Sequence, residues 1–538
     1  MLTIKENGRL VCPEAGLTSR QYAVIQGMPR QCYSEKQKHF TFIQTPLAAQ
    51  QLVDAGFALP NETKILYDKW ARFKTSVARP RPSYAGLLKT TPWKHQPLAI
   101  DFIERCPSPY MDMGMGTGKS LCTIGGIAAN GHKKTLILAP KAVVNVWPRE
   151  FRMHAHDDQF EVVALGDQYG SVAKKVAAAR ASLSRGGNVV IVINYESAHR
   201  EVFADWAETV RWDCVVGDEL HRCKSPTGSA AKFARNVPKG QGIGLSGTMM
   251  PHSPMDLWSQ FGFLEPALLG TSYMLFEKRY AIKGMYKEIV KFVNLEELHE
   301  RIKQLTFSVS SDVLDLPPAT HQQFRFRFSD KVMKAYRDVR KELFARIQDG
   351  VVTADNVLVR GLRLQQLTSG FYFDDNTRTE VDLDHQPKLE ALADWVDSVP
   401  RSERFVVFTR FTRDANGVAE QLRKQGFKVG QLYDGINQLT QDATFDLQFD
   451  CYVVNIASGG VGVDLTAANH AFYYSVSWNA GDYEQSLRRI LRPGQKRNVH
   501  FGHAVCEGTI DEEIYEAFLE RRDLADEVIR GIRNGGGK

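Results

Sequence analysis

Short apolar runs alternate with amphipathic segments along most of this chain. In the first half, runs such as TLILAP and VVIVINY end in polar or glycine-containing residues; they lie at 135–140, 189–195, 213–219 and 242–247. The pattern returns at 404–411, 428–435, 451–460 and 470–477. Runs of this length, bounded by loop signals, are typical of parallel strands that helices cover on both faces. The sequence therefore predicts two α/β units, one in each half of the chain.

Three further regions complete the predicted domain organisation. Residues 1–85 form a small α+β module, with strands in LTIKENGRL and HFTFIQTP and a helix in PLAAQQLVDAGF that ends at a glycine. The Pro- and Arg-rich segment 78–86 is a linker. The first α/β unit spans 88–254 and the second 381–525, with a mostly helical insertion at 255–380 between them and a flexible tail at 526–538.

Composition indicates the general class of protein but does not indicate a reaction. The chain has 538 residues, which exceeds what one hydrophobic core usually serves, and its 43% hydrophobic and 24% charged residues are ordinary for a globular protein. No apolar run is long enough to cross a bilayer and no signal peptide is visible, so we expect a cytoplasmic location. The eight cysteines have no zinc-ligand spacing, so we expect reduced and mostly buried thiols. A net charge of +6 mildly favours a polyanionic partner.

A glycine-rich segment, GMGTGKS at 114–120, carries the first chemical signal. Gly114 lies one residue nearer the lysine than the usual phosphate-loop frame requires, and Met113 occupies the standard place. The function depends on inward-facing backbone N–H groups, which small residues at Gly116, Thr117 and Gly118 permit. Lys119 would reach the β- and γ-phosphates of a nucleotide, and the hydroxyl of Ser120 would ligate Mg²⁺. A purely structural glycine-rich loop is the alternative.

An acidic pair supplies the second signal. Asp218 and Glu219 end the apolar run of DCVVGDELHR, about 100 residues after the glycine-rich loop. The carboxyl end of a parallel strand is where such sheets bind ligands. Asp218 would hold Mg²⁺ there, and Glu219 would orient or deprotonate the attacking water. The alternative for such a pair is a simple helix cap.

Over about residues 88–525 the chain resembles the Swi/Snf-type superfamily 2 helicase-like ATPases. The resemblance rests on KHQPLAIDFI, LILAPKAVVNVWPREF, VVIVINYES, DELHR, GLSGTMMPHSPMDLWS, VVFTRFT, SGGVGVDLTAANHAFYYSVSWNAGDYEQ and QSLRRILRPGQ. It implies two tandem RecA-like P-loop lobes that close on one ATP. It also implies that Gln96 reads the purine, that Gly462 lies at the nucleotide, and that Ser246 and Thr248 couple hydrolysis to lobe movement.

The resemblance gives a role to two arginines near the end of the chain. Arg489 and Arg492 lie three residues apart, a spacing that places them on one face of a helix. In the family such arginines belong to the second lobe and stabilise charge on the departing γ-phosphoryl group when the lobes close. Leu491 stands where the family usually has histidine, which marks a divergent member. Without the resemblance, the two arginines would be interpreted as part of a charged, solvent-exposed helix face.

Family resemblance also points to double-stranded or branched DNA as the partner, with ATP and Mg²⁺ as cofactors. Candidate contacts to the DNA backbone are Lys141, Tyr195, Thr409 and Arg410. The N-terminal module resembles the HepA-related module of fork-remodelling members, in a compact motor of bacterial or viral type. Its segment 30–40 interleaves basic and aromatic residues, among them Arg30 and Lys38, which suits backbone contact plus base stacking.

These observations favour an ATP-dependent DNA translocase that remodels forked or branched DNA in repair, recombination or replication. We expect a monomer in the cytoplasm, associated with the nucleoid or, for a viral protein, in the host cytoplasm. Two alternatives stay open. One is an RNA helicase of the DEAD type, although the motif ending in R-P-G-Q differs from the R-x-G-R of those enzymes. The other is an inactive ATPase that serves as a DNA-binding scaffold.

Overall fold

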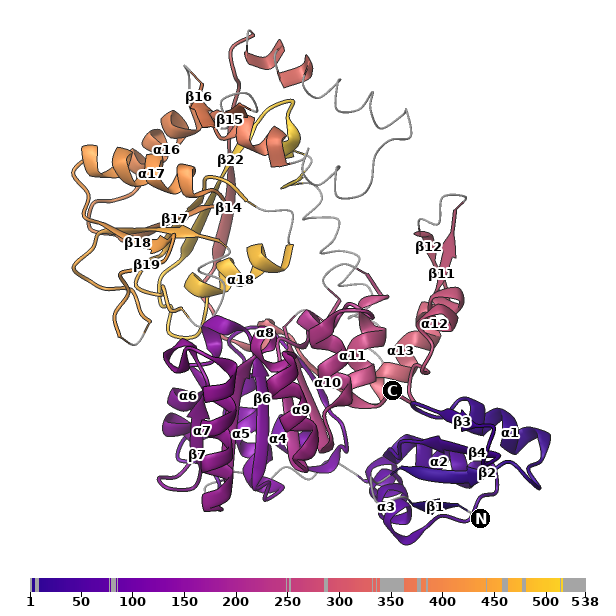
Figure 1. Ribbon diagram of the computed structural model, residues 1–538. Coiled ribbons are helices and arrows are strands. Elements are labelled where there is room, and N and C mark those ends of the chain that lie inside the picture. Colours follow the sequence, from indigo (N-terminus) through magenta and orange to yellow (C-terminus); the bar gives the residue numbers. More distant parts are fainter. Residues whose placement is uncertain are drawn as a thin grey trace. The chain divides into compact units, whose positions relative to one another are not determined.

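The structure, a computed structural model, contains two compact units, Met1–Val313 and Leu314–Leu524. It describes all residues except 1, 5–8, 77, 79–83, 85, 248, 251–252, 285–288, 331, 335, 339–361, 375–378, 384–385, 442, 457–462, 477–479, 513 and 516–538. Figure 1 shows the elements of each unit. No described helix is long and apolar enough to cross a membrane. All eight cysteines lie in the described part and are free, and all but Cys32 are buried, as expected.

The first unit begins with a small module built on a four-stranded antiparallel sheet of order β1-β2-β4-β3. Its strands are Thr3–Ile4, Leu10–Pro13, Cys32–Ser34 and His39–Phe42, and its helices are α1 (Ser19–Gln26), α2 (Pro46–Asp54) and α3 (Asn61–Thr75). The predicted helix after residue 46 is α2, and Gly56 follows it with a φ of 81°. The left-handed conformation that a glycine accepts at no cost therefore ends this turn.

A seven-stranded parallel sheet forms the body of the first unit, in the order β13-β5-β10-β9-β6-β8-β7. Its strands are β5 (Tyr110–Met113), β6 (Lys134–Ala139), β7 (Glu161–Ala164), β8 (Val189–Asn194), β9 (Trp212–Asp218), β10 (Lys239–Ser246) and β13 (Thr306–Val309). All six residues of β8 are buried, which explains why the sequence shows a continuous apolar run rather than an alternating one.

Helices surround this sheet and connect its parallel strands. They are α4 (Gln96–Arg105), α5 (Lys119–Ala129), α6 (Trp147–His154), α7 (Val172–Arg185), α8 (Tyr195–Ala198), α9 (Glu201–Thr209), α10 (Ser229–Asn236), α11 (Asp256–Leu264), α12 (Tyr273–Tyr280) and α13 (Leu295–Lys303). Short 3₁₀ turns lie at Lys141–Val143, Asp167–Tyr169 and Leu220–Cys223. Between α12 and α13, strands β11 (Ala281–Lys283) and β12 (Ile289–Phe292) form a separate antiparallel hairpin.

The second unit repeats the α/β plan with a seven-stranded sheet of order β14-β22-β21-β17-β20-β18-β19, in which only β19 is antiparallel to its neighbour. Its elements are β14 (Ala319–Phe326), β15 (Phe371–Asp374), β16 (Thr379–Asp382), α16 (Pro387–Ser398), β17 (Phe405–Thr409), α17 (Thr412–Lys424), β18 (Val429–Tyr433), β19 (Ile436–Asn437), β20 (Cys451–Asn455), β21 (His470–Tyr473), α18 (Ala480–Ile490) and β22 (Val499–Cys506), with a 3₁₀ turn at Ser311–Val313 just before the boundary. The two-lobe α/β fold predicted from the sequence is therefore confirmed.

The region between the lobes differs from the single helical insertion predicted for 255–380. It contains α11 to α13, but β13 within it is an edge strand of the first sheet and β14 is an edge strand of the second. The boundary between units falls at Val313 and Leu314, inside the predicted insertion. The sequence hides β14 because an edge strand is largely exposed, and ATHQQFRF is accordingly polar rather than apolar.

Candidate nucleotide site and nucleic-acid surfaces

The glycine-rich loop connects the carboxyl end of β5 to the first residue of α5. Gly116 and Gly118 have φ values of 79° and 89°, a conformation that L-residues rarely adopt. A Cβ on Gly118 would also lie 2.2 Å from Gln96 Nε2, so only glycine fits there. Thr117 Oγ1 donates to the carbonyl of Gly114 across 2.6 Å and closes the loop on itself. The loop thus has the conformation and the helix N-terminus that phosphate binding requires.

Gln96, the predicted purine-reading residue, packs against this loop. It is 1% exposed at the first turn of α4, and its Nε2 donates to the carbonyl of Thr117 across 3.0 Å. Its Oε1 accepts from the backbone N–H of Trp93 across 2.7 Å. His95 Nε2 lies 2.8 Å from the same Thr117 carbonyl. The two side chains therefore fix the loop from one side, and the contact of Gln96 with a purine stays a prediction.

Lys119 is the first residue of α5 and lies at the positive end of that helix. Its ammonium donates to the carbonyl of Met113 across 2.8 Å and lies 3.5 Å from that of Gly114. The ammonium is thus held over the concave side of the loop, where a phosphate oxygen would be a stronger acceptor than a neutral carbonyl. Ser120 follows it, partly exposed, with its hydroxyl on the helix N-terminus.

The acidic pair lies at the carboxyl edge of the same sheet, on β9, which β10 separates from β5. Asp218 Oδ2 accepts a hydrogen bond of 3.0 Å from Trp147 Nε1, and the Asp218 carbonyl accepts one of 2.9 Å from the hydroxyl of Tyr195. Burial and the neighbouring Glu219 carboxylate raise the pKa of Asp218 to about 7, against the lowering effects of Trp147 and Lys119. A buried carboxylate that is costly to ionise is well suited to a bound cation.

Glu219 turns away from the strand with a φ of 51°, in the left-handed region. Such a conformation in a residue other than glycine is strained and is common at functional positions. Among the described residues, no group donates a hydrogen bond to Glu219 Oε2, although His221 Nδ1 lies 3.3 Å away. His221 Nδ1 is also 3.0 Å from Ser246 Oγ at the end of β10, and burial lowers the pKa of this histidine. His221 therefore lies between Glu219 and Ser246.

The donor set fits Mg²⁺. Magnesium binds through one or two carboxylates, a hydroxyl and substrate phosphates rather than through a cage of protein ligands. Asp218 at the end of β9 and Ser120 at the start of α5 supply a carboxylate and a hydroxyl, and no cluster of three or more His, Cys, Asp or Glu side chains forms a metal site in the described part of the chain. The residues that sequence reasoning did not single out are Trp147 and His221. Both lie inside the quoted motifs, but their contacts depend on tertiary packing.

Arg489 and Arg492 lie in the second unit, at the end of α18 and just beyond it. Arg489 is 8% exposed, and its carbonyl accepts from the N–H of Leu465 across 3.0 Å. Arg492 Nη1 donates to the carbonyl of Val463 across 3.3 Å and lies 3.8 Å from Asp464 Oδ2. Both arginines are thus attached to segment 463–465. Gly462 and Thr248 lie outside the described residues.

The structure corrects two of the predicted DNA contacts. Tyr195 is 2% exposed because its ring lies in the core of the first unit and its hydroxyl binds the Asp218 carbonyl. Thr409 is 0% exposed because it ends β17, a central strand of the second sheet. Neither side chain is available at the surface. Tyr195 instead supports the strand that carries the acidic pair.

The other predicted contacts differ in accessibility. Arg30 is largely engaged, since its guanidinium donates to the carbonyl of Arg235 and to Asn236 Oδ1 and so attaches the N-terminal module to α10. Arg410 is half-buried, with its guanidinium 5.4 Å from the ring of Phe411. Lys38 is exposed with a φ of 45°, and the side chain of Lys141 is 66% exposed beside Asp167.

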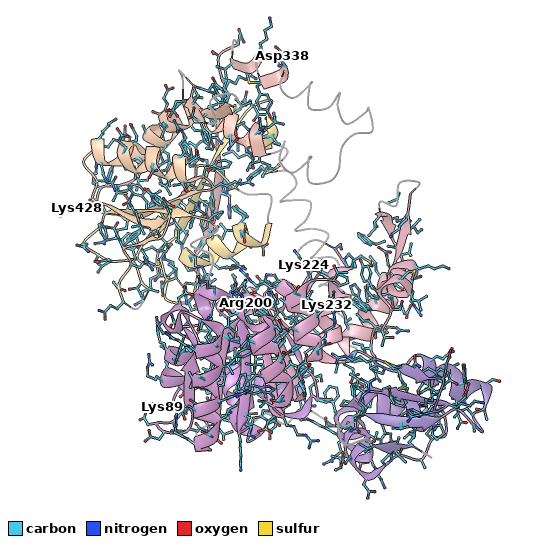
Figure 2. All side chains as sticks on the ribbon, in the orientation of Figure 1. Lys89, Arg200, Lys224, Lys232, Asp338 and Lys428 are labelled. Atoms are coloured by element: carbon cyan, nitrogen blue, oxygen red, sulfur yellow. The ribbon has the colours of Figure 1, made fainter. Side chains whose placement is uncertain are left out.

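A cleft of about 840 Å³ lies beside Lys141, at the carboxyl ends of β6 and β8. Three cationic side chains line it, Lys141, Lys175 and the exposed Arg200, which is labelled in Figure 2. Lys175 is 5% exposed, and its ammonium donates to Ser197 Oγ across 3.1 Å. The first turn of α7 also borders the cleft, and helix N-termini attract anions. Acidic side chains share the lining, so the cations are interspersed rather than contiguous.

The comparisons with known proteins fit this geometry. The SNF2-related domain matches residues 31–370, and the helicase conserved C-terminal domain matches residues 387–494. The putative ATP-dependent helicase/translocase YwqA of Bacillus subtilis is 24% identical over 442 residues, which cover 77% of this chain but 46% of YwqA. This chain thus spans about half the length of that relative.

Two further similarities differ in how much of each protein they cover. The putative protein p41 of Acyrthosiphon pisum secondary endosymbiont phage 1 is 25% identical over 471 residues, 82% of this chain and 99% of p41. The Sulfolobus solfataricus SWI2/SNF2 ATPase core in complex with dsDNA aligns over 84% of this chain and 94% of that structure, with 21% identity and a TM-score of 0.37. Because the SNF2-related domain covers more than half of the residues and the helicase domain follows it, the chain belongs to the Swi/Snf-type superfamily 2 of helicase-like ATPases.

Proposed function

We propose that this protein is an ATP-dependent translocase on double-stranded DNA that remodels forked or branched DNA in repair, recombination or replication. The observation that carries the proposal is the first-unit site, where a phosphate-loop lysine and a strained, buried acidic pair meet at one edge of a parallel sheet. A phosphate-loop lysine together with such an acidic pair is the residue set that nucleoside-triphosphate hydrolases use. The name of the relative YwqA, a helicase/translocase, supports the same class of activity.

The residues divide the chemistry between them. Backbone N–H groups of the loop and the ammonium of Lys119 would hold the β- and γ-phosphates. Asp218 and Ser120 would hold Mg²⁺, which supplies neutralisation of the charge that develops on the phosphates. Glu219 Oε2, with no hydrogen-bond donor among the described residues, would accept from the attacking water and align it. Arg489 and Arg492 of the second unit would stabilise the departing γ-phosphoryl group.

DNA as the partner is supported by charge and by the cleft beside Lys141. The net charge of +6 and the cations Lys141, Lys175 and Arg200 suit a phosphate backbone, which is recognised by charge and shape rather than by base sequence. Removing one such cation should weaken binding to all sequences alike and reduce the salt slope by about 1. Arg200→Ala is the sharpest variant, because Arg200 is exposed and lies outside the nucleotide site.

The test is ATP turnover measured with duplex, single-stranded, forked and four-way DNA and with RNA. We expect stimulation by duplex and branched DNA, with Lys119→Ala inactive and Glu219→Gln able to bind ATP but slow to hydrolyse it. Stimulation by RNA alone would replace the proposal with an RNA helicase of the DEAD type. Absence of any turnover in the wild-type protein, together with tight DNA binding, would indicate a scaffold instead.

A further inference from the structure

The hairpin of β11 and β12 is the least covered sheet in the described part of the first unit. Ala281–Lys283 and Ile289–Phe292 pair only with each other, in an antiparallel two-stranded sheet between α12 and α13. Figure 1 shows this hairpin extending from the end of α12, away from the seven-stranded sheet. A two-stranded sheet on its own is at best marginally stable in water, so a largely exposed hairpin calls for an explanation.

The hairpin is covered at its base, where Ala281 is buried and Phe292 packs against the core of the first unit, and it is largely exposed beyond that pair. Residues directly opposite each other share a face, and Ile282 lies opposite Lys291 while Lys283 lies opposite Ile289. The register shifts between Ile282 and Lys283, so Val290 has no residue opposite it and the regular alternation of faces is interrupted there. Ile282 and Val290 are 50% and 66% exposed. Antiparallel sheets usually bury one face against a core, whereas this one leaves these aliphatic side chains exposed beside its lysines.

The charge around these aliphatic side chains is positive. Within the described residues of α12 and the hairpin, four cations accompany one carboxylate, Glu277. Lys283 pairs with Glu277 across 2.6 Å, and Arg279 pairs with Glu297 across 2.7 Å. Lys278 and Lys291 make no ion pair with any described residue. The surface is therefore apolar and basic at once.

Duplex DNA fits this combination better than a protein partner does. Lysine is depleted from protein–protein interfaces relative to the rest of the protein surface. The grooves of DNA, by contrast, admit a two-stranded β-ribbon, whose lysines can reach phosphates on both flanks. Aliphatic side chains on such a ribbon contact sugars and base edges or enter between base steps.

From these observations we infer that the β11–β12 hairpin is a second duplex-binding element, which enters a DNA groove with Ile282 and Val290 and holds the flanking phosphates with Lys278 and Lys291. The inference rests on the proposed action on DNA and adds an element to it. Because the inference assigns Lys278 and Lys291 to phosphates, and the described hairpin residues include no Arg, Asn or Gln, we expect this contact to be independent of base sequence.

The test separates the aliphatic from the ionic contribution in the full-length protein. Ile282→Thr/Val290→Thr keeps β-branched side chains and so preserves the strand. We expect the affinity for a duplex of several helical turns to fall roughly fivefold to tenfold, the loss for two partly buried aliphatic groups, with an unchanged salt slope. Lys278→Ala and Lys291→Ala should each reduce the salt slope by about 1 between ~50 and ~200 mM salt.

Ile436→Thr is the matched control, because Ile436 is 42% exposed on the two-stranded edge formed by β18 and β19 of the second unit. It should bind DNA like the wild type. Nucleotide affinity and turnover without DNA should be unchanged in all these variants. Wild-type DNA binding by the double threonine variant would overturn the hairpin inference and leave the proposed function untouched. Failure of the wild-type protein to bind duplex DNA would overturn the proposed function together with it.

Discussion

At the scale of single residues, Arg489 and Arg492 give the sharpest prediction. Arg489→Ala and Arg492→Ala should each lower DNA-stimulated turnover by about 10³-fold, because a guanidinium that neutralises transition-state charge acts on hydrolysis and not on ground-state binding. The affinity for nucleotide, which the phosphate loop holds in the first unit, should change little. Steady-state ATPase assays and equilibrium nucleotide titrations measure the two effects separately.

Arg488→Ala is the control for this pair, since Arg488 is the immediate neighbour on the same helix. It should retain most of the turnover. Melting temperatures are needed alongside, because Arg489 is largely buried and its loss also removes packing. Near-normal turnover in both alanine variants would remove the arginines from the reaction and would leave them as supports of segment 463–465.

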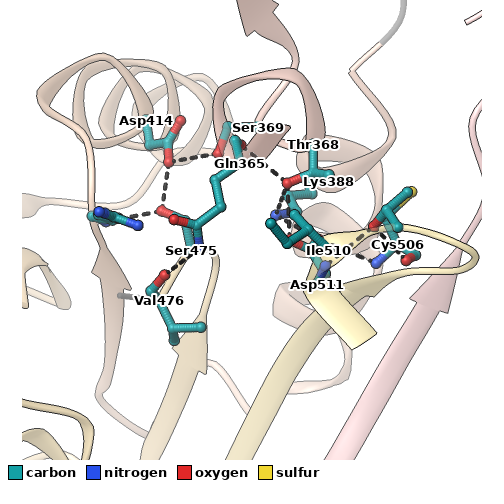
Figure 3. Close-up of polar contacts among 12 residues, drawn as sticks. Gln365, Thr368, Ser369, Lys388, Asp414, Ser475, Val476, Cys506, Ile510 and Asp511 are labelled. Atoms are coloured by element: carbon teal, nitrogen blue, oxygen red, sulfur yellow. Dashed lines mark hydrogen bonds and ion pairs between the residues drawn. The ribbon is translucent and has the colours of Figure 1, made fainter. Parts of the chain in front are cut away.

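Asp414 provides a pH-dependent prediction in the second unit. Its Oδ2 accepts from Ser369 Oγ across 3.0 Å and from Ser475 Oγ, and the Ser475 hydroxyl oxygen in turn accepts from the N–H of Arg410 (Figure 3). Burial raises the pKa of Asp414 to about 7 from 3.8. The folded state therefore binds this proton more tightly than the unfolded state, and its stabilising effect is lost as the pH rises toward 7.

Asp414→Asn removes that titration while keeping an oxygen acceptor for both serines. The melting temperature of the variant relative to wild type should therefore increase as the pH rises from about 5 to about 8. Asp397→Asn, an exposed carboxylate on α16, is the control and should show no such trend. A difference between Asp414→Asn and wild type that is independent of pH would show that the carboxyl is ionised across this whole range.

The conformation of the glycine-rich loop was the most predictable feature of the candidate site, and the burial of the proposed DNA contacts was the least. The conformation of a phosphate loop depends on about seven consecutive residues, so a short sequence pattern suffices to predict it. Burial is not local. Tyr195 lies next to the acidic pair because β8 and β9 flank β6 in the sheet, which no short pattern reveals. Trp147 was missed as a partner of Asp218 for the same reason.

At the scale of elements, Gln495 connects the end of α18 to the segment before β21 through hydrogen bonds to backbone carbonyls. Gln495 is buried, and its Nε2 donates to the carbonyls of Thr466 and Ala468 across 3.1 and 2.8 Å and lies 3.4 Å from that of Ile490. The amide thus attaches the end of the helix that carries Arg489 to segment 466–468. If the arginines act on the nucleotide as proposed, we expect Gln495 to position them.

Gln495→Ala should therefore lower the turnover about tenfold while the affinity for nucleotide stays near wild type, a cost on the scale of one lost buried hydrogen-bonding group. Gln495→Glu should be worse than alanine, because it faces carbonyl oxygens with carboxylate oxygens. Gln448→Ala, at an exposed position in the same unit, is the control. Equal effects on turnover and on nucleotide affinity would indicate a general loss of folding instead.

Most strands in the middle of each sheet were predicted, although β5 and β22 were not, and the strands at the edges were missed. β6, β8, β9, β17 and β20 are buried on both faces and read as continuous apolar runs. β13 is an edge strand of the first sheet and β14 is an edge strand of the second. Their residues are partly exposed, so they lack a continuous apolar run. Both strands fall inside the predicted helical insertion for this reason, because an exposed strand lacks the hydrophobic pattern that would distinguish it from a loop.

At the scale of the whole first unit, the N-terminal module is joined to the parallel-sheet body by a buried glutamate. Glu265 of the body accepts from Thr45 Oγ1 and, across 3.2 Å, from the N–H of Leu47, so it completes the N-terminal cap of α2. Ala267, two residues further along the chain, packs into the core of the module. Burial raises the pKa of Glu265 to about 7. A helix cap supplied by another domain makes helix and interface depend on each other.

Glu265→Ala should therefore loosen the module from the body without affecting the nucleotide site. We expect faster amide hydrogen exchange at Leu47 and Ala48, where α2 begins, and unchanged exchange in β9. Turnover without DNA should stay at the wild-type level, whereas stimulation by forked DNA should fall if the module presents that DNA to the motor. Glu62→Ala, an exposed glutamate in the first turn of α3, is the control and should change neither measurement. Unchanged exchange at the start of α2 would show that the interface does not depend on this cap. Faster exchange with undiminished stimulation by forks would show that the module is attached to the motor for a purpose other than DNA recognition.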